Sequence, residues 1–252
     1  MPPLGLHTVI AKEVGDRLRH RVLDAERGNL YLGSTAPDIR VITRWERGRT
    51  HFFDLHNFDE QNGVAGLFSA YPRLGQPGSL RPGTAAFVAG YVTHLVMDEL
   101  WINTIYRPFF GQRSPLGGDL RANIMDRAIQ FSLDREKRID RELMANVLEA
   151  VAKSDLALEI EFIDGETLHR WKELILDVVD HPPDWERFRY VASRHLREAG
   201  IETPEQFEEF VRSLPDLVDE TLRYLTEGRV REFMDSAVQG SVTAVKEYLE
   251  CA

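Results

Sequence analysis

Apolar residues recur at three- and four-residue intervals through most of the chain, starting with the segment from Leu6 to Glu26. This spacing places apolar side chains on one face of an α-helix. Strand-like patterning is confined to Leu156–Ile163. We therefore predict an all-α, multi-helix fold. The further helical segments are Gly63–Tyr71, Gly90–Trp101, Asp119–Asp134, Arg138–Ala152, Gly165–Val179, Trp185–Arg197, Glu205–Leu225 and Val230–Leu249.

Glycine and proline predict where the helices are interrupted. Gly33 and Pro37 fall within Leu30–Ile39 and predict a turn just before Asp38. Arg73–Gly83 is rich in both residues, and it predicts a loop that leads into the apolar segment around Gly90–Trp101.

Composition narrows the classes of protein that fit. The chain has 252 residues and a net charge of -10, from 31 Lys and Arg against 41 Asp and Glu, which disfavours general nucleic-acid binding. Cys251 is the only cysteine, so no disulfide forms within the chain. The start lacks the pattern of a signal peptide, and the longest apolar run, Ala85–Met97, is too short to span a bilayer. We expect a soluble cytoplasmic protein without a transmembrane segment.

The segment Gly90–Trp101 carries the strongest chemical signal. His94 and Asp98 are four residues apart, so on a helix they lie on one face and can share a cation. Large apolar residues surround the pair, and burial makes an uncompensated carboxylate costly. The alternative is a core histidine that hydrogen-bonds to Asp98.

Three residues upstream are further candidate ligands. His7 lies at the start of the first amphipathic segment, Asp38 follows the predicted turn, and His51 precedes two aromatic residues. Asp54 is a candidate to hydrogen-bond the imidazole of His51 and so orient that ring as a metal ligand. Asp38 could instead be an ordinary turn or helix-capping residue.

Arginines gather between residues 40 and 49. Within a chain of net charge -10, Arg40, Arg44, Arg47 and Arg49 stand against Glu46 alone. A guanidinium group pairs well with phosphate oxygens. We take Arg40, Arg44 and Arg49 as candidate phosphate ligands, and a solvated loop is the alternative.

The order of these motifs resembles the zinc-dependent phospholipase C family, which is related to single-strand-specific zinc nucleases. The shared pattern is an early His, a Gly-x-x-x-Pro-Asp turn, a His followed by aromatics, and Gly-x-x-x-His-x-x-x-Asp on a buried helix, and it covers Leu6–Trp101. The resemblance implies a helical bundle of that type, with an additional helical C-terminal region. We expect one domain over residues 1–252, with a metal-site half at 1–110 and a helical half or cap at 111–252.

The resemblance also implies a ligand set and an activity. Asp38, His51, His94 and Asp98 would bind one metal, and Asp98 would reach a second metal held by His7. The resemblance implies two zinc ions, and iron or manganese suit the same nitrogen and oxygen ligands. The implied enzyme is a metal-dependent hydrolase that cleaves a small-molecule or lipid phosphoester with an activated water. Asp38 would be the catalytic carboxylate.

The sequence departs from the family pattern at two places. It begins Met1-Pro2-Pro3, where secreted members expose a ligating Trp after processing, and it has no His between Asp98 and His169. A third metal site is therefore absent or rebuilt from carboxylates such as Asp119 or Asp126.

The sequence disfavours two other classes of helical metal protein and leaves a third class open. An HD-type phosphohydrolase needs an adjacent His-Asp doublet, which the sequence lacks. A ferritin-like oxidase needs two Glu-x-x-His pairs, and only Glu166–His169 fits. A non-catalytic helical interaction or scaffold protein with a structural metal stays open as the alternative.

Overall fold

The computed structural model describes residues 3–55, 57–59, 61–181 and 184–251. It is 78% helical, and these residues form no strand, which confirms the predicted all-α fold. The segment with strand-like patterning is an irregular connection between two helices. Its residues Ile160, Phe162 and Ile163 are buried. Phe162 stacks on Tyr71, with ring centroids 4.6 Å apart. The apolar residues of this connection therefore pack against other side chains.

The chain divides into two compact units that interleave along the sequence. Unit 1 comprises Met1–Pro3, Leu100–Ile139 and Pro182–Ser236. Unit 2 comprises Leu4–Glu99, Asp140–His181 and Ala237–Ala252. The chain passes from unit 2 to unit 1 within one continuous helix, α7 (Pro82–Trp101). The single domain and its division near residue 110 stay predictions.

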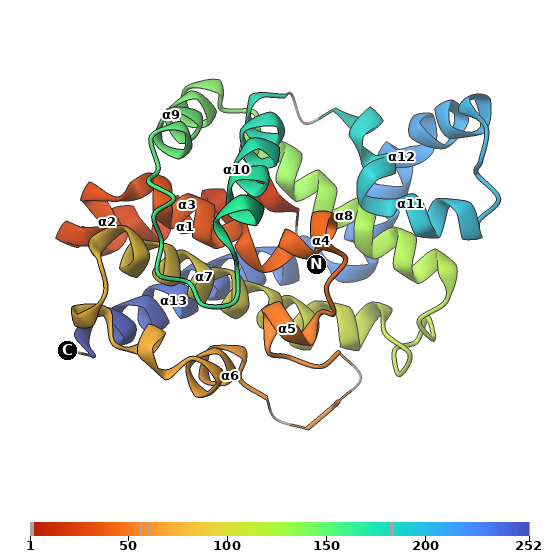
Figure 1. Cartoon of the computed structure of the whole chain (residues 1–252). Helices are drawn as coiled ribbons and strands as arrows, with labels where there is room; N and C mark the ends of the chain where they lie inside the picture. Colours follow the sequence, from red (N-terminus) through yellow and green to blue (C-terminus); the bar gives the residue numbers. More distant parts are fainter. Residues whose placement is uncertain (1–2, 56, 60, 182–183, 252) are drawn as a thin grey trace. The chain divides into compact units, whose positions relative to one another are not determined.

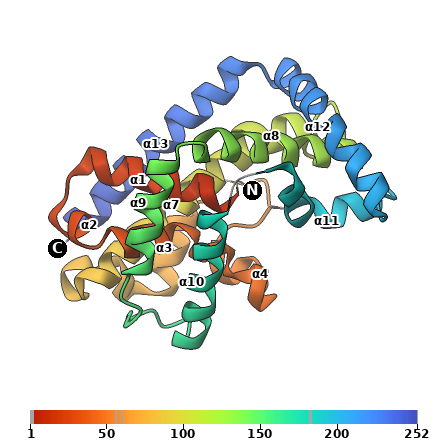
Figure 2. The same cartoon turned by 90° about the horizontal axis from the view of Figure 1, so that it is seen from above.

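Unit 2 contains the N-terminal helices and the five predicted ligands His7, Asp38, His51, His94 and Asp98. In Figures 1 and 2, α1 lies beside α3, and α9 lies against α3 and α10. Besides most of α7 and the end of α13 (Glu227–Glu250), its elements are α1 (Leu4–Leu18), α2 (Arg21–Ala25), α3 (Arg27–Thr35), η1 (Ala36–Ile39), α4 (Arg40–Thr43), α5 (Gly48–His51), α6 (Gly63–Ala70), η2 (Pro72–Gly75), η3 (Pro77–Ser79), α9 (Arg141–Ala152) and α10 (Gly165–Asp180).

Two glycines let α3 and α7 approach at backbone distance. A Cβ atom on Gly33 would lie 2.0 Å from the carbonyl oxygen of Phe87, and one on Gly90 would lie 2.0 Å from that of Leu30. Any side chain at either position would therefore push the helices apart. These are the glycines of the two motifs noted in the sequence, and their role here is close packing.

The N-terminal region differs from the sequence prediction in two places. The helix expected over Leu6–Glu26 breaks at Arg19, where φ is 46°, and the His20 ring accepts a hydrogen bond from Val22 N to start α2. The turn expected within Leu30–Ile39 is instead the end of α3 followed by η1. Gly33 lies within α3, where it allows the close approach of α7, and it does not end the helix.

Unit 1 has its own core around Trp101. The indole ring meets Phe233 edge to face, with centroids 4.9 Å apart, and its Nε1 donates to buried Asp126 at 2.9 Å. Among the described residues, no helix combines the length and apolarity that a membrane crossing requires. With the start of α13, the elements of unit 1 are η4 (Ile102–Phe110, a π-helix), α8 (Leu120–Arg138), η5 (Trp185–Arg187), α11 (Phe188–Glu198) and α12 (Pro204–Leu225).

Candidate metal centre

The structure brings all five predicted ligands together inside unit 2. His7 comes from the first turns of α1, Asp38 from η1, His51 from the end of α5, and His94 and Asp98 from one face of α7. We call these five residues the His/Asp cluster. Two overlapping sets within it, His7 with His94 and Asp98, and Asp38 with His51 and His94, have ligand atoms within 4.8 Å of one another. The cluster can therefore hold a metal ion.

Asp98 lies at the centre of the cluster. Its Oδ1 is 3.5 Å from Nε2 of His7. Its Oδ2 is 3.4 Å from Nε2 of His51 and 3.6 Å from Nε2 of His94. Nε2 of His51 is also 3.5 Å from Oδ1 of Asp38. All three imidazoles thus direct the same nitrogen toward shared carboxylates.

These separations suit ligands of a common ion better than hydrogen-bond partners. Zinc–nitrogen bonds of about 2.0–2.1 Å put two tetrahedral ligand atoms about 3.3 Å apart. Direct N–H···O bonds are shorter, at about 2.9 Å. Within the described part of the chain, Nε2 of His7, His51 and His94 forms no hydrogen bond although each ring is buried. Buried nitrogens without a partner are costly, and a metal ion would satisfy them.

Backbone and hydroxyl groups fix the orientation of two of the rings. Nδ1 of His94 is 2.7 Å from the carbonyl oxygen of Ser34, so Nδ1 carries the proton and Nε2 is left with its lone pair. Nδ1 of His51 is 3.0 Å from Oγ1 of Thr50. The Tyr91 hydroxyl, on α7, donates to the carbonyl oxygen of Thr50. Such contacts hold a ligating imidazole in place.

The electrostatics of the His/Asp cluster favour a bound cation. Burial, and then the neighbouring His94, lowers the pKa of His7 to about 4. Burial also opposes charge on His94, but Asp98 and Asp38 outweigh it and raise the pKa of His94. In turn the histidines hold the pKa of Asp98 and of Asp38 below the usual range, against the effect of burial. The two carboxylates are therefore ionised, and positive charge stabilises them.

Arg47, in the basic segment 40–49, contacts the His/Asp cluster, although it was not among the predicted phosphate ligands. Nη2 of Arg47 donates to Oδ2 of Asp98 at 3.0 Å. Arg49 donates to the carbonyl oxygen of Phe162 and stacks over Trp45, and Arg40 donates to the carbonyl oxygen of Trp45. Arg44 is exposed, with a left-handed φ of 61°. The phosphate role predicted for Arg40, Arg44 and Arg49 stays a prediction.

Three other sequence candidates lie in different settings. Asp54 is exposed and its backbone pairs with the side chain of Gln61, whereas Thr50 contacts the ring that Asp54 was expected to orient. Asp119 caps α8 through Ala122 N, and Asp126 accepts from Trp101, both within unit 1. Thr50 was missed because a threonine beside a histidine carries no pattern of its own.

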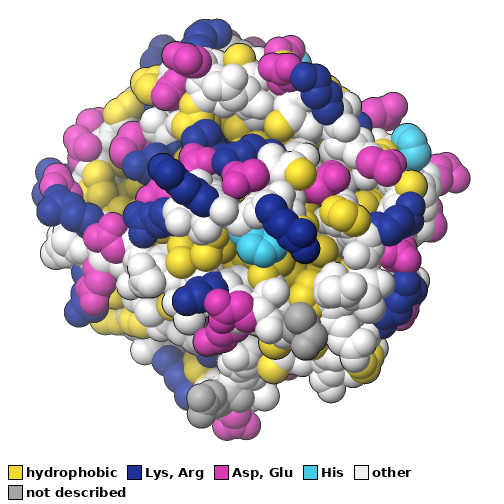
Figure 3. Space-filling view, turned by 90° about the vertical axis from the view of Figure 1, so that its left-hand side faces the viewer, with side chains coloured by type: hydrophobic (Ala, Val, Ile, Leu, Met, Phe, Trp, Pro, Cys, Tyr) yellow, Lys and Arg dark blue, Asp and Glu magenta, His cyan; other side chains and the backbone are white. Residues whose placement is uncertain are grey.

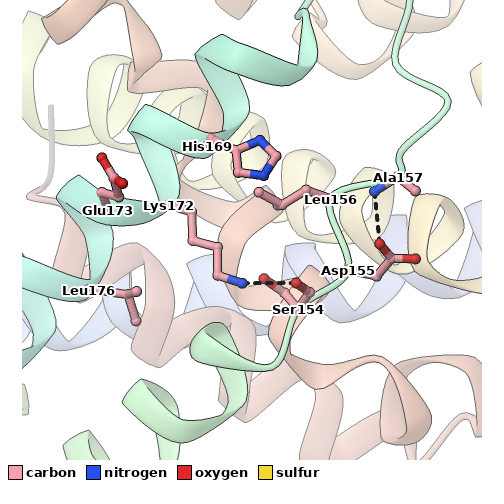
Figure 4. Close-up of a pocket in the computed structure, with 8 residues that line it drawn as sticks. All are labelled: Ser154, Asp155, Leu156, Ala157, His169, Lys172, Glu173 and Leu176. Carbon is pink, nitrogen blue, oxygen red and sulfur yellow. Dashed lines mark hydrogen bonds between the residues drawn. The ribbon is translucent and has the colours of Figure 1, made fainter.

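The surface of unit 2 also has a hollow of about 570 Å³, lined by residues of α10 and of the connection after α9 (Figure 4). Lys172 donates there to the carbonyl oxygens of Ala152 and Ser154, at 2.8 and 2.9 Å. Its ammonium group therefore caps the end of α9. The residues that line the hollow include none of the His/Asp cluster.

Elsewhere on the surface, basic and acidic side chains are interspersed on the face drawn in Figure 3.

The fold and the His/Asp cluster together define an all-α protein with a buried group of residues that could bind a metal. The chain matched no family model, no curated protein and no solved structure. The resemblance to the zinc-dependent phospholipase C family therefore stays a prediction from the sequence motifs.

Proposed function

We propose that the protein is a metal-dependent hydrolase that cleaves a phosphoester, with zinc as the expected metal. The observation that carries the proposal is the placement of Asp98 between two sets of nitrogens. Oδ1 faces His7, and Oδ2 faces His51 and His94. Two overlapping groups, His7 with His94 and Asp98, and Asp38 with His51 and His94, would hold the metal, and a divalent ion there would activate water for attack on phosphorus.

The residues have distinct roles in the proposed reaction. His7, Asp38, His51, His94 and Asp98 would hold the metal. When bound, a divalent ion lowers the pKa of water and offsets negative charge on a phosphoryl oxygen. Asp38 has an ionised carboxylate whose side chain is 12% exposed, against 0–3% for the other four. Asp38 therefore lies at the accessible edge of the cluster, where it can accept a proton from an attacking water.

The test is hydrolysis of bis(p-nitrophenyl) phosphate and p-nitrophenyl phosphate by zinc-loaded protein. We expect turnover by the wild type and a loss of about 10²–10⁴-fold in Asp38→Asn, as for removal of a general base. Zinc content is measured on the same samples, so that loss of the base is separated from loss of metal. Zinc-loaded wild type that hydrolyses neither ester, or unchanged turnover in Asp38→Asn, would contradict the proposal.

A structural metal site in a non-catalytic scaffold protein is the second candidate. The near-complete burial of His7, His51, His94 and Asp98 favours it, because structural sites are closed to solvent. This candidate predicts that zinc raises the unfolding temperature and that no phosphoester is hydrolysed. The assay above, run beside a thermal unfolding measurement, separates the two functions.

A further inference from the structure

The face of α7 that carries two of the candidate ligands also carries Tyr91. Tyr91, His94 and Asp98 follow one another at intervals of three and four residues, so they form one stripe along the helix. Tyr91 is 1% exposed, and its hydroxyl donates to the carbonyl oxygen of Thr50 on α5. This hydrogen bond joins the ligand-bearing face of α7 to the residue just before His51.

The hydroxyl of Thr50 links the backbone to the ring of His51. Its Oγ1 lies 3.0 Å from Nδ1 of His51 and 3.4 Å from the carbonyl oxygen of Arg47. A carbonyl oxygen can only accept, so the hydroxyl proton is directed at Arg47 and an Oγ1 lone pair faces Nδ1. Nδ1 of His51 therefore carries the ring proton, which leaves the Nε2 lone pair to face Asp38 and Asp98.

The three histidines of the His/Asp cluster differ in how they are anchored. Nδ1 of His94 is held by a backbone carbonyl, and Nδ1 of His51 is held by a side-chain hydroxyl. Among the described residues, Nδ1 of His7 has no hydrogen-bond partner. Helix α5 is four residues long, too short to fix His51 without tertiary contacts. The orientation of His51 therefore depends on side chains that a single substitution removes.

We propose that Thr50 and Tyr91 are positioning residues that hold His51 in the orientation in which it binds the metal. This inference rests on the metal centre of the proposed function, and it is independent of the ester that the centre would cleave. Contacts of this kind behind a ligating histidine contribute about 10–100-fold to metal affinity.

The test is zinc affinity, measured by competition with a chromogenic chelator, in Thr50→Val and Thr50→Ser. Valine keeps the size of threonine but removes the hydroxyl, whereas serine keeps the hydroxyl. We expect affinity to fall about 10–100-fold in Thr50→Val and to stay close to that of the wild type in Thr50→Ser. A role in packing alone predicts the opposite order, because valine fills the buried space and serine does not.

Thr8→Val is the matched control. Thr8 follows His7 on α1, it is 1% exposed against 0% for Thr50, and its hydroxyl donates to the carbonyl oxygen of Leu4. Neither ring nitrogen of His7 bonds to it. The substitution thus removes a buried hydroxyl beside a candidate ligand without removing a contact to the imidazole. We expect zinc affinity in Thr8→Val to match the wild type.

Tyr91→Phe tests the same anchor from α7, and it decides the inference if Thr50→Val does not fold. The ring is kept and the bond to the Thr50 carbonyl is lost, so zinc affinity is expected to fall. Tyr248→Phe is the control for this change. Tyr248 is 3% exposed and, within the described part of the chain, its hydroxyl has no hydrogen-bond partner.

Each other result overturns the inference in a distinguishable way. Circular dichroism of the zinc-free proteins identifies the folded variants. Unchanged affinity in folded Thr50→Val, or a larger loss in Thr50→Ser, would show that the hydroxyl does not position His51. Unchanged affinity in Tyr91→Phe would remove Tyr91 from the assignment, and an equal loss in Thr8→Val would reveal a general effect of buried hydroxyls.

Failure of the proposed function is read separately. Wild type that binds no zinc would remove the metal centre together with this inference. Wild type that binds zinc and hydrolyses neither nitrophenyl ester would contradict the hydrolase alone. In that case the expected losses in Thr50→Val and Tyr91→Phe would still support the two positioning residues.

Discussion

Asp98 is the residue on which the proposed metal centre depends. Its carboxylate is buried, and it lies within 3.6 Å of three imidazole nitrogens and 3.0 Å of the Arg47 guanidinium. A buried carboxylate is stable only when positive charge or donors compensate it. Because its two oxygens face different histidines, loss of one oxygen's charge affects both halves of the site.

Asp98→Asn is therefore predicted to weaken binding of both metals, by more than about tenfold. Zinc stoichiometry by elemental analysis after dialysis measures this directly. Asp16→Asn, which removes a carboxylate that is 43% exposed on α1, is the matched control. Full metal content in Asp98→Asn would remove the bridging role.

Protonation of His94 leads to a pH dependence of zinc binding. Burial opposes charge on His94, but Asp98 and Asp38 outweigh it and raise its pKa above the ordinary value of 6.5, so as pH falls a proton occupies the ring sooner than it would a free imidazole. Because a metal needs the deprotonated ring, zinc affinity is predicted to fall by up to about tenfold per pH unit below that pKa. Chelator competition at pH 8, 7 and 6 measures the affinity, with exposed His169→Gln as control. An affinity that is independent of pH would argue against His94 as a ligand.

At this scale the sequence predicts the residues that share a periodic element. His94 and Asp98 follow from a four-residue spacing on a helix, and the structure places them on one face of α7. Arg47 and Thr50 do not follow from spacing. Their positions depend on an irregular connection in which Arg44 and Phe52 adopt left-handed φ values of 61° and 54°. Non-glycine residues rarely adopt such angles, so local propensity predicts another path.

At the scale of elements, the crossing of α3 with α7 positions the centre. Gly33 and Gly90 allow the two backbones to approach, and Ser34 on α3 then accepts the hydrogen bond of His94 on α7. The close packing of α3 against α7 therefore also orients His94 as a candidate ligand.

Gly90→Ala is predicted to lower the free energy of unfolding by about 1–3 kcal/mol, since a Cβ atom there would overlap the Leu30 carbonyl oxygen. Gly78→Ala is the matched control, because a Cβ atom on Gly78 has no neighbour within 4 Å. Urea unfolding of both variants measures the difference. Equal stability of Gly90→Ala and Gly78→Ala would contradict the close crossing.

Most helices could be predicted from periodicity because each buries one apolar face. The exceptions are local: α3 contains the glycine that predicted a turn, and the first amphipathic segment is split by the left-handed Arg19. Gly33 is retained within a helix because α7 lies against it. A tertiary contact of this kind has no signal in a single sequence.

At the scale of the whole molecule, the two compact units differ in their predicted response to zinc. All five residues of the His/Asp cluster belong to unit 2. The interleaving of units arises from contacts between distant segments, such as Gly28 of α3 against the Ala150 carbonyl of α9. Linear composition does not reveal such pairings, so the sequence could predict helices without predicting the units.

Zinc is predicted to slow amide hydrogen exchange in unit 2, chiefly in α3 and α7, more than in α8 and α12 of unit 1. Binding to the folded state stabilises it by about 2.7 kcal/mol at a free zinc concentration of 100 Kd. Exchange monitored by mass spectrometry with and without zinc measures the local effect. Equal slowing in the two units, or none, would contradict a site confined to unit 2.

The central claim, that the His/Asp cluster is a metal centre, is tested most directly by anomalous diffraction at the zinc edge from crystals grown with zinc. We expect anomalous density bonded to Nε2 of His94 and to Asp98, and a second peak bonded to Nε2 of His7. Crystals of His94→Ala serve as the control, in which the first peak is lost. Zinc found only at other positions, or no anomalous density within the cluster, would show that the cluster is not a metal centre.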